Sequence, residues 1–162
     1  MATVFKPQYT TSAAITMSVA SLANGSYWQS AAVDNSTSLF ADAHIYGHVK
    51  SNGTPTANAV YTLFLYWSND GGTTYSNGAS GLDQSFTQSD NDANMVVGAT
   101  AVCVATASLT SNFRGFSFCQ QAGLLYLPVK WGLILKNSSG QPLTGTGANH
   151  VFSYQGVNMT GV

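Results

Sequence analysis

The chain has no glutamate and few charges of any kind. Of its 162 residues, 7% are charged, with six Asp against five Lys and Arg and a formal net charge of −1, whereas soluble domains usually carry about 25%. A protein that binds nucleic acid needs a basic face to neutralise phosphates, and this composition argues against one. It also argues against long surface helices, which Glu and Lys usually solvate.

Cysteine is scarce as well, and long apolar runs are missing. Cys103 and Cys119 both lie in apolar stretches, so we expect them to be free buried thiols rather than part of a disulfide scaffold. No run approaches the ~20 apolar residues of a membrane span. Apolar and polar residues alternate within 13–23, unlike the continuous core of a signal peptide. We therefore expect synthesis in the cytoplasm, with no signal peptide and no membrane association.

Short alternating runs separated by turn residues make up most of the chain, and with 44% hydrophobic residues disorder is not expected. The pattern predicts an all-β fold without helices: a single antiparallel β-sandwich, jelly-roll-like, of about eight strands over residues 13–162. Residues 1–12 are predicted to form an extended N-terminal arm, and 69–94 a long, projecting polar loop with little core of its own. The predicted strands cover 13–22, 27–33, 39–50, 59–68, 95–106, 113–119, 129–136 and 150–159.

The alternation also predicts which side chains face the core. In 39–50 the core face carries Leu39, Ala41, Ala43, Ile45 and Val49. In 129–136 it carries Val129, Trp131, Leu133 and Leu135, and in 113–119 a single face holds Arg114, Phe116 and Phe118. The run 59–68 is apolar on both faces, which fits either a central strand covered on both sides or a strand at a subunit contact.

The sequence contains no pattern typical of catalysis or metal binding. His44 and His48 share a strand face but lie roughly 13 Å apart, too far to bind one metal ion together. Residues 90–94 begin like a calcium loop, yet Met95 and Ala101 occupy the positions that require Gly and Glu. We find neither a G-x-S-x-G elbow nor a phosphate-binding loop. We therefore expect no enzyme, no catalytic residues, no metal and no cofactor.

Three segments resemble a family of small virion proteins of tailed bacteriophages. They are WQSAAVDN at 28–35, YWSNDGGTTY at 66–75, and LPVKWG at 127–132 followed by NH at 149–150 and YQGV at 154–157. Such proteins resemble capsid decoration (cement) proteins, β-sandwich subunits that clamp neighbouring capsomers, often as trimers. The resemblance implies a location in the virion, the major capsid protein as partner, and a homo-oligomer, with a trimer favoured.

Two other functions stay open at this point: a structural protein of the phage tail or its adaptor region, and a carbohydrate-binding module. In a carbohydrate-binding module, Trp28 or Tyr66 would lie exposed to stack on sugar rings, while Trp67 and Trp131 fit the core. For a virion protein the arm supplies the contact residues, because an extended arm with apolar side chains can order on a neighbouring subunit. The predicted partner-interface residues are Val4, Phe5, Pro7, Tyr9 and Tyr66.

Overall fold

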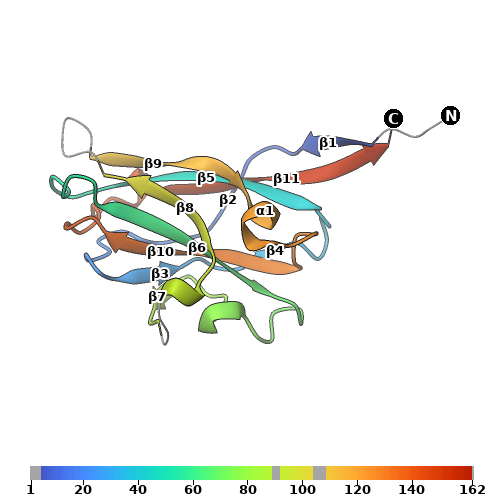
Figure 1. Cartoon of the computed structure of the whole chain (residues 1–162), viewed down its shortest axis with the longest axis horizontal. Coiled ribbons are helices and arrows are strands. Elements are labelled where there is room, and N and C mark those ends of the chain that lie inside the picture. The colour runs from blue at the N-terminus through green and yellow to red at the C-terminus, as the bar shows by residue number, and fades with distance from the viewer. Residues whose placement is uncertain (1–4, 89–91, 104–108, 162) are drawn as a thin grey trace.

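The computed structural model describes residues 5–88, 92–103 and 109–161, and these fold into two antiparallel sheets packed face to face (Figure 1). The strands are β1 (Phe5–Tyr9), β2 (Ala13–Ala14), β3 (Tyr27–Gln29), β4 (Val33–Asp34), β5 (Asp42–Lys50), β6 (Val60–Ser68), β7 (Gln84–Phe86), β8 (Val97–Val102), β9 (Thr110–Ser117), β10 (Lys130–Ser138) and β11 (Val151–Gly161).

The strand order is that of a jelly roll, as predicted. The first sheet runs β1-β11-β5-β9, with β2 also paired to β11; the second runs β7-β3-β10-β6-β8, with β4 also paired to β10. Along the chain β5, β6, β9, β10 and β11 alternate between the two sheets, with β8 joining β6 in the second sheet. This crossing places the apolar faces of both sheets against each other in one core.

The prediction that the chain has no helix is wrong at one place. A short helix, α1 (Phe118–Ala122), follows β9; the Ser117 side chain caps its start by accepting the Gln120 N–H. Gly123 ends it with a left-handed backbone (φ 67°), the conformation that favours glycine. Single-turn 3-10 helices span Ser76–Gly78, Asp92–Asn94 and Gly147–Asn149. No helix in the described ranges has the length and apolar character needed to cross a membrane.

The predicted core faces are largely confirmed on β5 and β10. Ala43, Ile45 and Val49 are buried, as are Trp131, Leu133 and Leu135 of β10. Val129 is exposed, because it lies just before β10 begins. Leu39 is also exposed: its backbone turns into the left-handed region (φ 51°) and β5 begins only at Asp42.

The alternation also fails within β9. The pairing between β5 and β9 changes register between Ile45 and Gly47. On β9 both Phe113 and Phe116 enter the core, although they are three residues apart, and Arg114 stays exposed. The prediction that Arg114 and Phe116 share a face is therefore wrong, since the irregularity interrupts the period of two.

The predicted strand at 13–22 is mostly irregular, although its apolar residues are buried as the alternation suggests. Only Ala13–Ala14 is strand; Ile15, Met17 and Val19 still point into the core. The main chain beyond Ala14 bonds to partners outside a ladder: the Ile15 N–H donates to the Phe152 carbonyl, and the Ala31 N–H to the Thr16 carbonyl.

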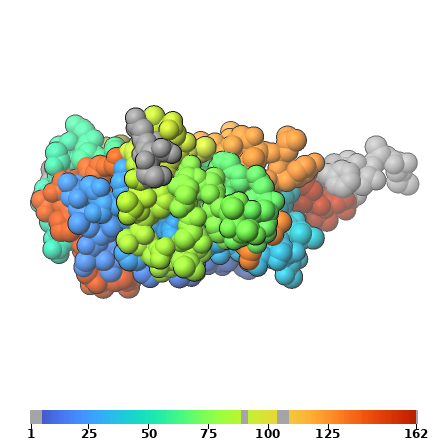
Figure 2. Space-filling model, turned by 90° about the horizontal axis from the view of Figure 1, so that it is seen from below, coloured from blue at the N-terminus to red at the C-terminus, as the bar shows by residue number. Residues whose placement is uncertain are grey.

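The outer face of the second sheet explains why 59–68 is apolar on both sides. Phe64 and Tyr66 of β6 lie on that face, where they form a second buried cluster with Ala79 and Phe86. In Figure 2 the green and yellow-green atoms of the chain after β6 spread across this face. The described part of the polar segment 69–94 (69–88 and 92–94) therefore covers the sheet and adds Ala79 and Phe86 to this small second core, in contrast to the projecting loop that we expected. Of the two interpretations, the central strand covered on both sides is correct.

Both cysteines are buried free thiols, as expected. Burial raises the pKa of each, that of Cys119 to about 12. Of the predicted strand 95–106, residues 104–106 lie outside the described residues, and β8 covers Val97–Val102.

Candidate functional site

Three segments from different parts of the chain meet at one end of the sandwich (Figure 1). They are the loop 35–41 before β5, the loop 123–129 between α1 and β10, and a ribbon in which β1 pairs with residues 157–161 of β11. Figure 1 shows this terminal ribbon projecting beyond the body of the protein. We call the two loops and the terminal ribbon together the apolar end.

Large apolar side chains are unusually exposed on the two loops. Leu125 is 90% exposed, Tyr126 75% and Leu39 71%. Tyr9 and Met159 of the terminal ribbon are 58% and 55% exposed. Exposed apolar residues scattered singly are ordinary, but several on adjoining segments mark a contact surface.

Asn35 holds the two loops together. Its buried side chain donates to the Phe40 carbonyl (3.0 Å) and accepts the Phe40 N–H (2.9 Å), which closes the turn that carries Leu39. Its own N–H donates to the Val129 carbonyl at 2.8 Å. The Leu127 N–H in turn donates to the Ala41 carbonyl at 2.9 Å. The apolar end is therefore a preformed surface, fixed by main-chain hydrogen bonds in both directions.

Asp42 fixes the α1 side of the same end. Its carboxylate accepts hydrogen bonds from the Ser117 hydroxyl and from the Cys119 N–H (3.0 Å), at the start of α1. A carboxylate that binds the N–H groups of a first helical turn orients the helix. The chain then leaves α1 through Gly123 and presents Leu125 and Tyr126 to solvent.

The terminal ribbon has one edge that is guarded against strand addition. The Thr10 N–H donates to the Gly156 carbonyl; by the alternation of an antiparallel ladder, the backbone groups of Pro7 and Tyr9 then face away from β11. Pro7 has no N–H to offer on that outer edge, which blocks regular pairing with another strand. Contacts made by the ribbon therefore depend on its side chains rather than on the outer edge of β1.

The predicted contact residues fall in different places. Pro7 and Tyr9 are exposed on the terminal ribbon, as an arm contact requires. Val4 lies outside the described residues, and Phe5 belongs to β1. Tyr66 is fully buried under the segment 69–94 and its hydroxyl donates to the Ser30 carbonyl (2.7 Å), so a partner cannot reach it in this structure.

The predicted sugar platform is not formed by Trp28 or Tyr66. The Trp28 indole N–H donates to the Asp83 carboxylate at 2.7 Å, which ties the half-buried ring to the covering segment. Burial raises the pKa of Tyr66, in keeping with its place inside the protein. Tyr66 therefore has no exposed ring face, and Trp28 is held against the covering segment instead of standing free on a flat surface.

Most aspartates serve as hydrogen-bond acceptors that fix loops. Lys130 pairs with Asp34 (2.5 Å), and Lys136 pairs with Asp92, which also accepts the Tyr27 hydroxyl. Burial raises the pKa of Asp92, but the hydrogen bonds from Lys136 and Tyr27 outweigh it and the net shift is downward. A carboxylate held ionised in this way is a poor general acid or base at neutral pH.

The described residues contain no group of three or more His, Cys and Asp side chains that could hold a metal ion. His44 and His48 stand on β5 as half-exposed strand residues. In the calcium-like segment, Asp90 and Asn91 lie outside the described residues, and Asp92 is engaged with Lys136.

Sequence reasoning missed Leu39, Leu125 and Tyr126. The available signal was the apolar run 124–127, which lies between the glycine that ends α1 and Pro128, where a turn rather than a strand is expected. Comparison with known proteins adds no identification: no family model, no curated protein and no solved structure matches the chain.

Proposed function

We propose that the protein is a structural component of a bacteriophage virion, a capsid decoration protein that binds the outside of the shell and stabilises it. The observation that carries the proposal is the apolar end, where Leu39, Leu125 and Tyr126 stand exposed on two loops that main-chain hydrogen bonds join to each other. The resemblance of the segments 28–35, 66–75 and 127–132 to small virion proteins supplies the class of assembly. In this role the partner is the major capsid protein and the subunits form a homo-oligomer, with a trimer favoured.

The energetics of the apolar end suit such a role. Burying two leucines and a tyrosine contributes about 4–9 kcal/mol before the costs of association are subtracted. Since only 7% of residues are charged, little of the binding would depend on ion pairs that salt screens. Many weak, salt-insensitive contacts repeated over a shell suffice to stabilise it, because each copy adds its own contribution.

The proposal is tested on particles that lack the protein, to which purified protein is added back. The expected result is that wild-type protein binds and raises the temperature at which the particles release DNA. Leu125→Asp should bind at least tenfold more weakly, a loss of about 1.4 kcal/mol. Leu82→Asp is the matched control, because Leu82 is also exposed (61%) but lies in the segment 69–94, which covers the second sheet away from the apolar end.

Several results would contradict the proposal. Particles without the protein that are as heat-resistant as complete ones would exclude the stabilising role. Equal binding of wild type and Leu125→Asp would exclude the apolar end as the contact. Labelled protein found at the tail in electron micrographs would place it in the tail or adaptor region instead, and light scattering that shows only monomer at high concentration would exclude the homo-oligomer.

A further inference from the structure

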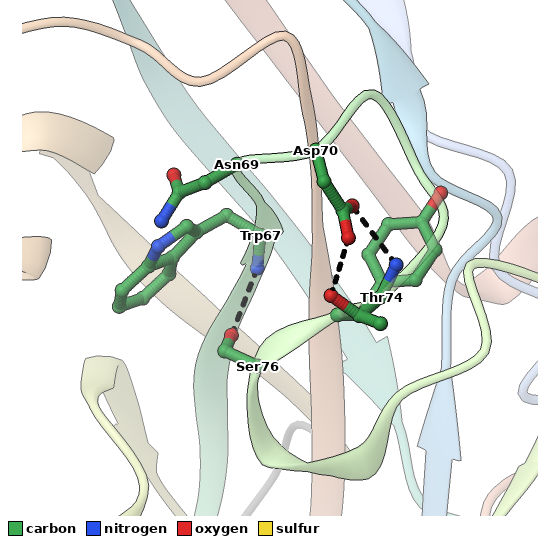
Figure 3. Close-up of a pocket in the computed structure, with 6 residues that line it drawn as sticks. Trp67, Asn69, Asp70, Thr74 and Ser76 are labelled. Atoms are coloured by element: carbon green, nitrogen blue, oxygen red, sulfur yellow. Dashed lines mark hydrogen bonds between the residues drawn. The ribbon is translucent and has the colours of Figure 1, made fainter.

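A hollow of about 480 Å³ opens beside the end of β6, separate from Leu39, Leu125 and Tyr126. Its lining comes from the last residues of β6 and the turn that follows: Trp67, Asn69, Asp70, Thr74, Tyr75 and Ser76. Figure 3 shows Trp67 near the end of β6 with Asn69 just after it, and Thr74 and Ser76 on the segment that returns beside them. Nothing in the proposed virion role requires this hollow.

Two aromatic rings form its walls, and both are held from behind. The half-buried Trp67 indole packs edge-on against Phe118 of the core (6.3 Å between ring centres). Tyr75 packs edge-on against the buried Tyr66 (5.5 Å). The Trp67 N–H donates to the Ser76 hydroxyl at 3.0 Å, which fixes the start of the 3-10 helix Ser76–Gly78 beside Trp67.

The carboxylate of Asp70 shapes the turn, and both of its oxygens are occupied by hydrogen bonds within the turn. It accepts the Ser68 hydroxyl (2.6 Å), the Thr74 hydroxyl (2.6 Å) and two backbone N–H groups, of Thr73 and Thr74. These hydrogen bonds, that of Ser68 foremost, hold the pKa of Asp70 below its usual value. The turn is thus formed without any ligand, and the carboxylate has few lone pairs left to bind one.

The groups left free for a ligand are neutral. Asn69 is exposed, and within the described residues its amide makes no hydrogen bond; it can both donate and accept. The Trp67 indole N–H can only donate, and among the described residues it also has no hydrogen-bond acceptor. The Ser76 hydroxyl accepts the Trp67 N–H and keeps its own proton to donate.

From this arrangement we propose that the hollow binds a neutral sugar ring, with a pyranose stacked on Trp67 and its hydroxyls bonded to Asn69 and Ser76. A pyranose has an apolar C–H face that matches an indole and a rim of hydroxyls that match amides and hydroxyls. The fixed negative charge of Asp70 repels anions. Its engaged oxygens leave little for a metal cation, which needs several free oxygen ligands.

The test uses the purified full-length chain and four sugars: glucose, galactose, mannose and N-acetylglucosamine. We expect at least one to bind with a Kd in the millimolar range, as a single small ring in a preformed site would. Binding is measured by saturation-transfer NMR and by tryptophan fluorescence. Asn69→Ala should weaken it at least tenfold, and far-UV circular dichroism should show that this variant stays folded.

Asn112→Ala is the matched control, because Asn112 is another exposed asparagine that lines a different hollow, beside Arg114 on β9. It should bind the sugar as wild type does. The inference is overturned if none of the four sugars binds, if Asn69→Ala and Asn112→Ala behave alike, or if sialic acid or inorganic phosphate binds more tightly than every neutral sugar. Because these measurements need no virion, their outcome is independent of the proposed function.

Discussion

Removal of the Asn35 side chain tests whether one buried amide holds closed the turn 35–41, which carries Leu39 at the apolar end. In Asn35→Ala two hydrogen bonds to the main chain of Phe40 are lost, at 2.9 and 3.0 Å. Each is worth about 1 kcal/mol net, and the Phe40 groups left without a partner add a further penalty. We expect the free energy of unfolding to fall by about 2–3 kcal/mol.

The loss of free energy is measured by urea unfolding, followed by tryptophan fluorescence. On heating, the same loss corresponds to a fall in melting temperature of roughly 4–12 °C. Asn24→Ala is the comparison: the Asn24 side chain also accepts a main-chain N–H, that of Gly140 (2.8 Å), but it does so at the exposed surface. Its loss should cost well under 1 kcal/mol, because water replaces the partner. If both variants lose the same stability, the anchoring role of Asn35 is refuted.

Three further predictions follow from contacts elsewhere in the structure. Gly156→Ala should destabilise the protein by about 1–3 kcal/mol, because a Cβ there would lie about 2.4 Å from the Phe40 ring; Phe40→Leu in the same chain should restore part of the loss in urea unfolding. Burial raises the pKa of Asp83, but the hydrogen bonds that its carboxylate accepts lower it by more, so the pKa in the folded protein is depressed. The ionised carboxylate therefore stabilises the fold above the unfolded pKa of about 3.9, and this stabilisation is lost as the pH falls through the folded pKa. In Asp83→Asn the free energy of unfolding should vary less with pH in that range, and an unchanged pH profile would contradict the prediction. Buried Cys103 and Cys119, whose pKa values burial raises, should react with a thiol reagent far more slowly in the folded protein than in urea, and equal rates would show that they are accessible.

Of the candidate site, the sequence predicted the extended shape of the N-terminal segment, and residues 5–9 form the strand β1; the contact role of the arm stays a prediction. Its apolar residues and Pro7 indicated an extended contact segment, and the structure places Pro7 and Tyr9 on an exposed ribbon. The pairing of that ribbon with β11 was not predictable, because the register between residues 5–9 and 157–161 joins opposite ends of the chain. The same distance in sequence hides the contact between the loops 35–41 and 123–129.

The hollow beside Trp67 shows the same limit. Alternation along β6 correctly indicated that Trp67 faces inward with Tyr61, Leu63 and Leu65. It could not show that the ring lies where the core ends and is therefore only half covered. The exposure of the ring depends on how far the turn after β6 folds back, and the hydrogen bonds from Ser68 and Thr74 to Asp70 fix the shape of that turn.

The sequence by itself determined the fold class and most of the inward faces, because a period of two and frequent turn residues suit only strands, and because buried positions such as Ile45, Leu133 and Leu135 follow that period. Only the tertiary structure decided what covers the outer face of β6 and β10 and which apolar residues remain in solvent. Coverage is a property of segments far apart in sequence: Phe86 and Ile134 are brought into one buried cluster, while none of the described residues covers Leu125. Local periodicity carries no information about such contacts, so the exposed apolar surface that we propose as the contact is the part least visible in the sequence.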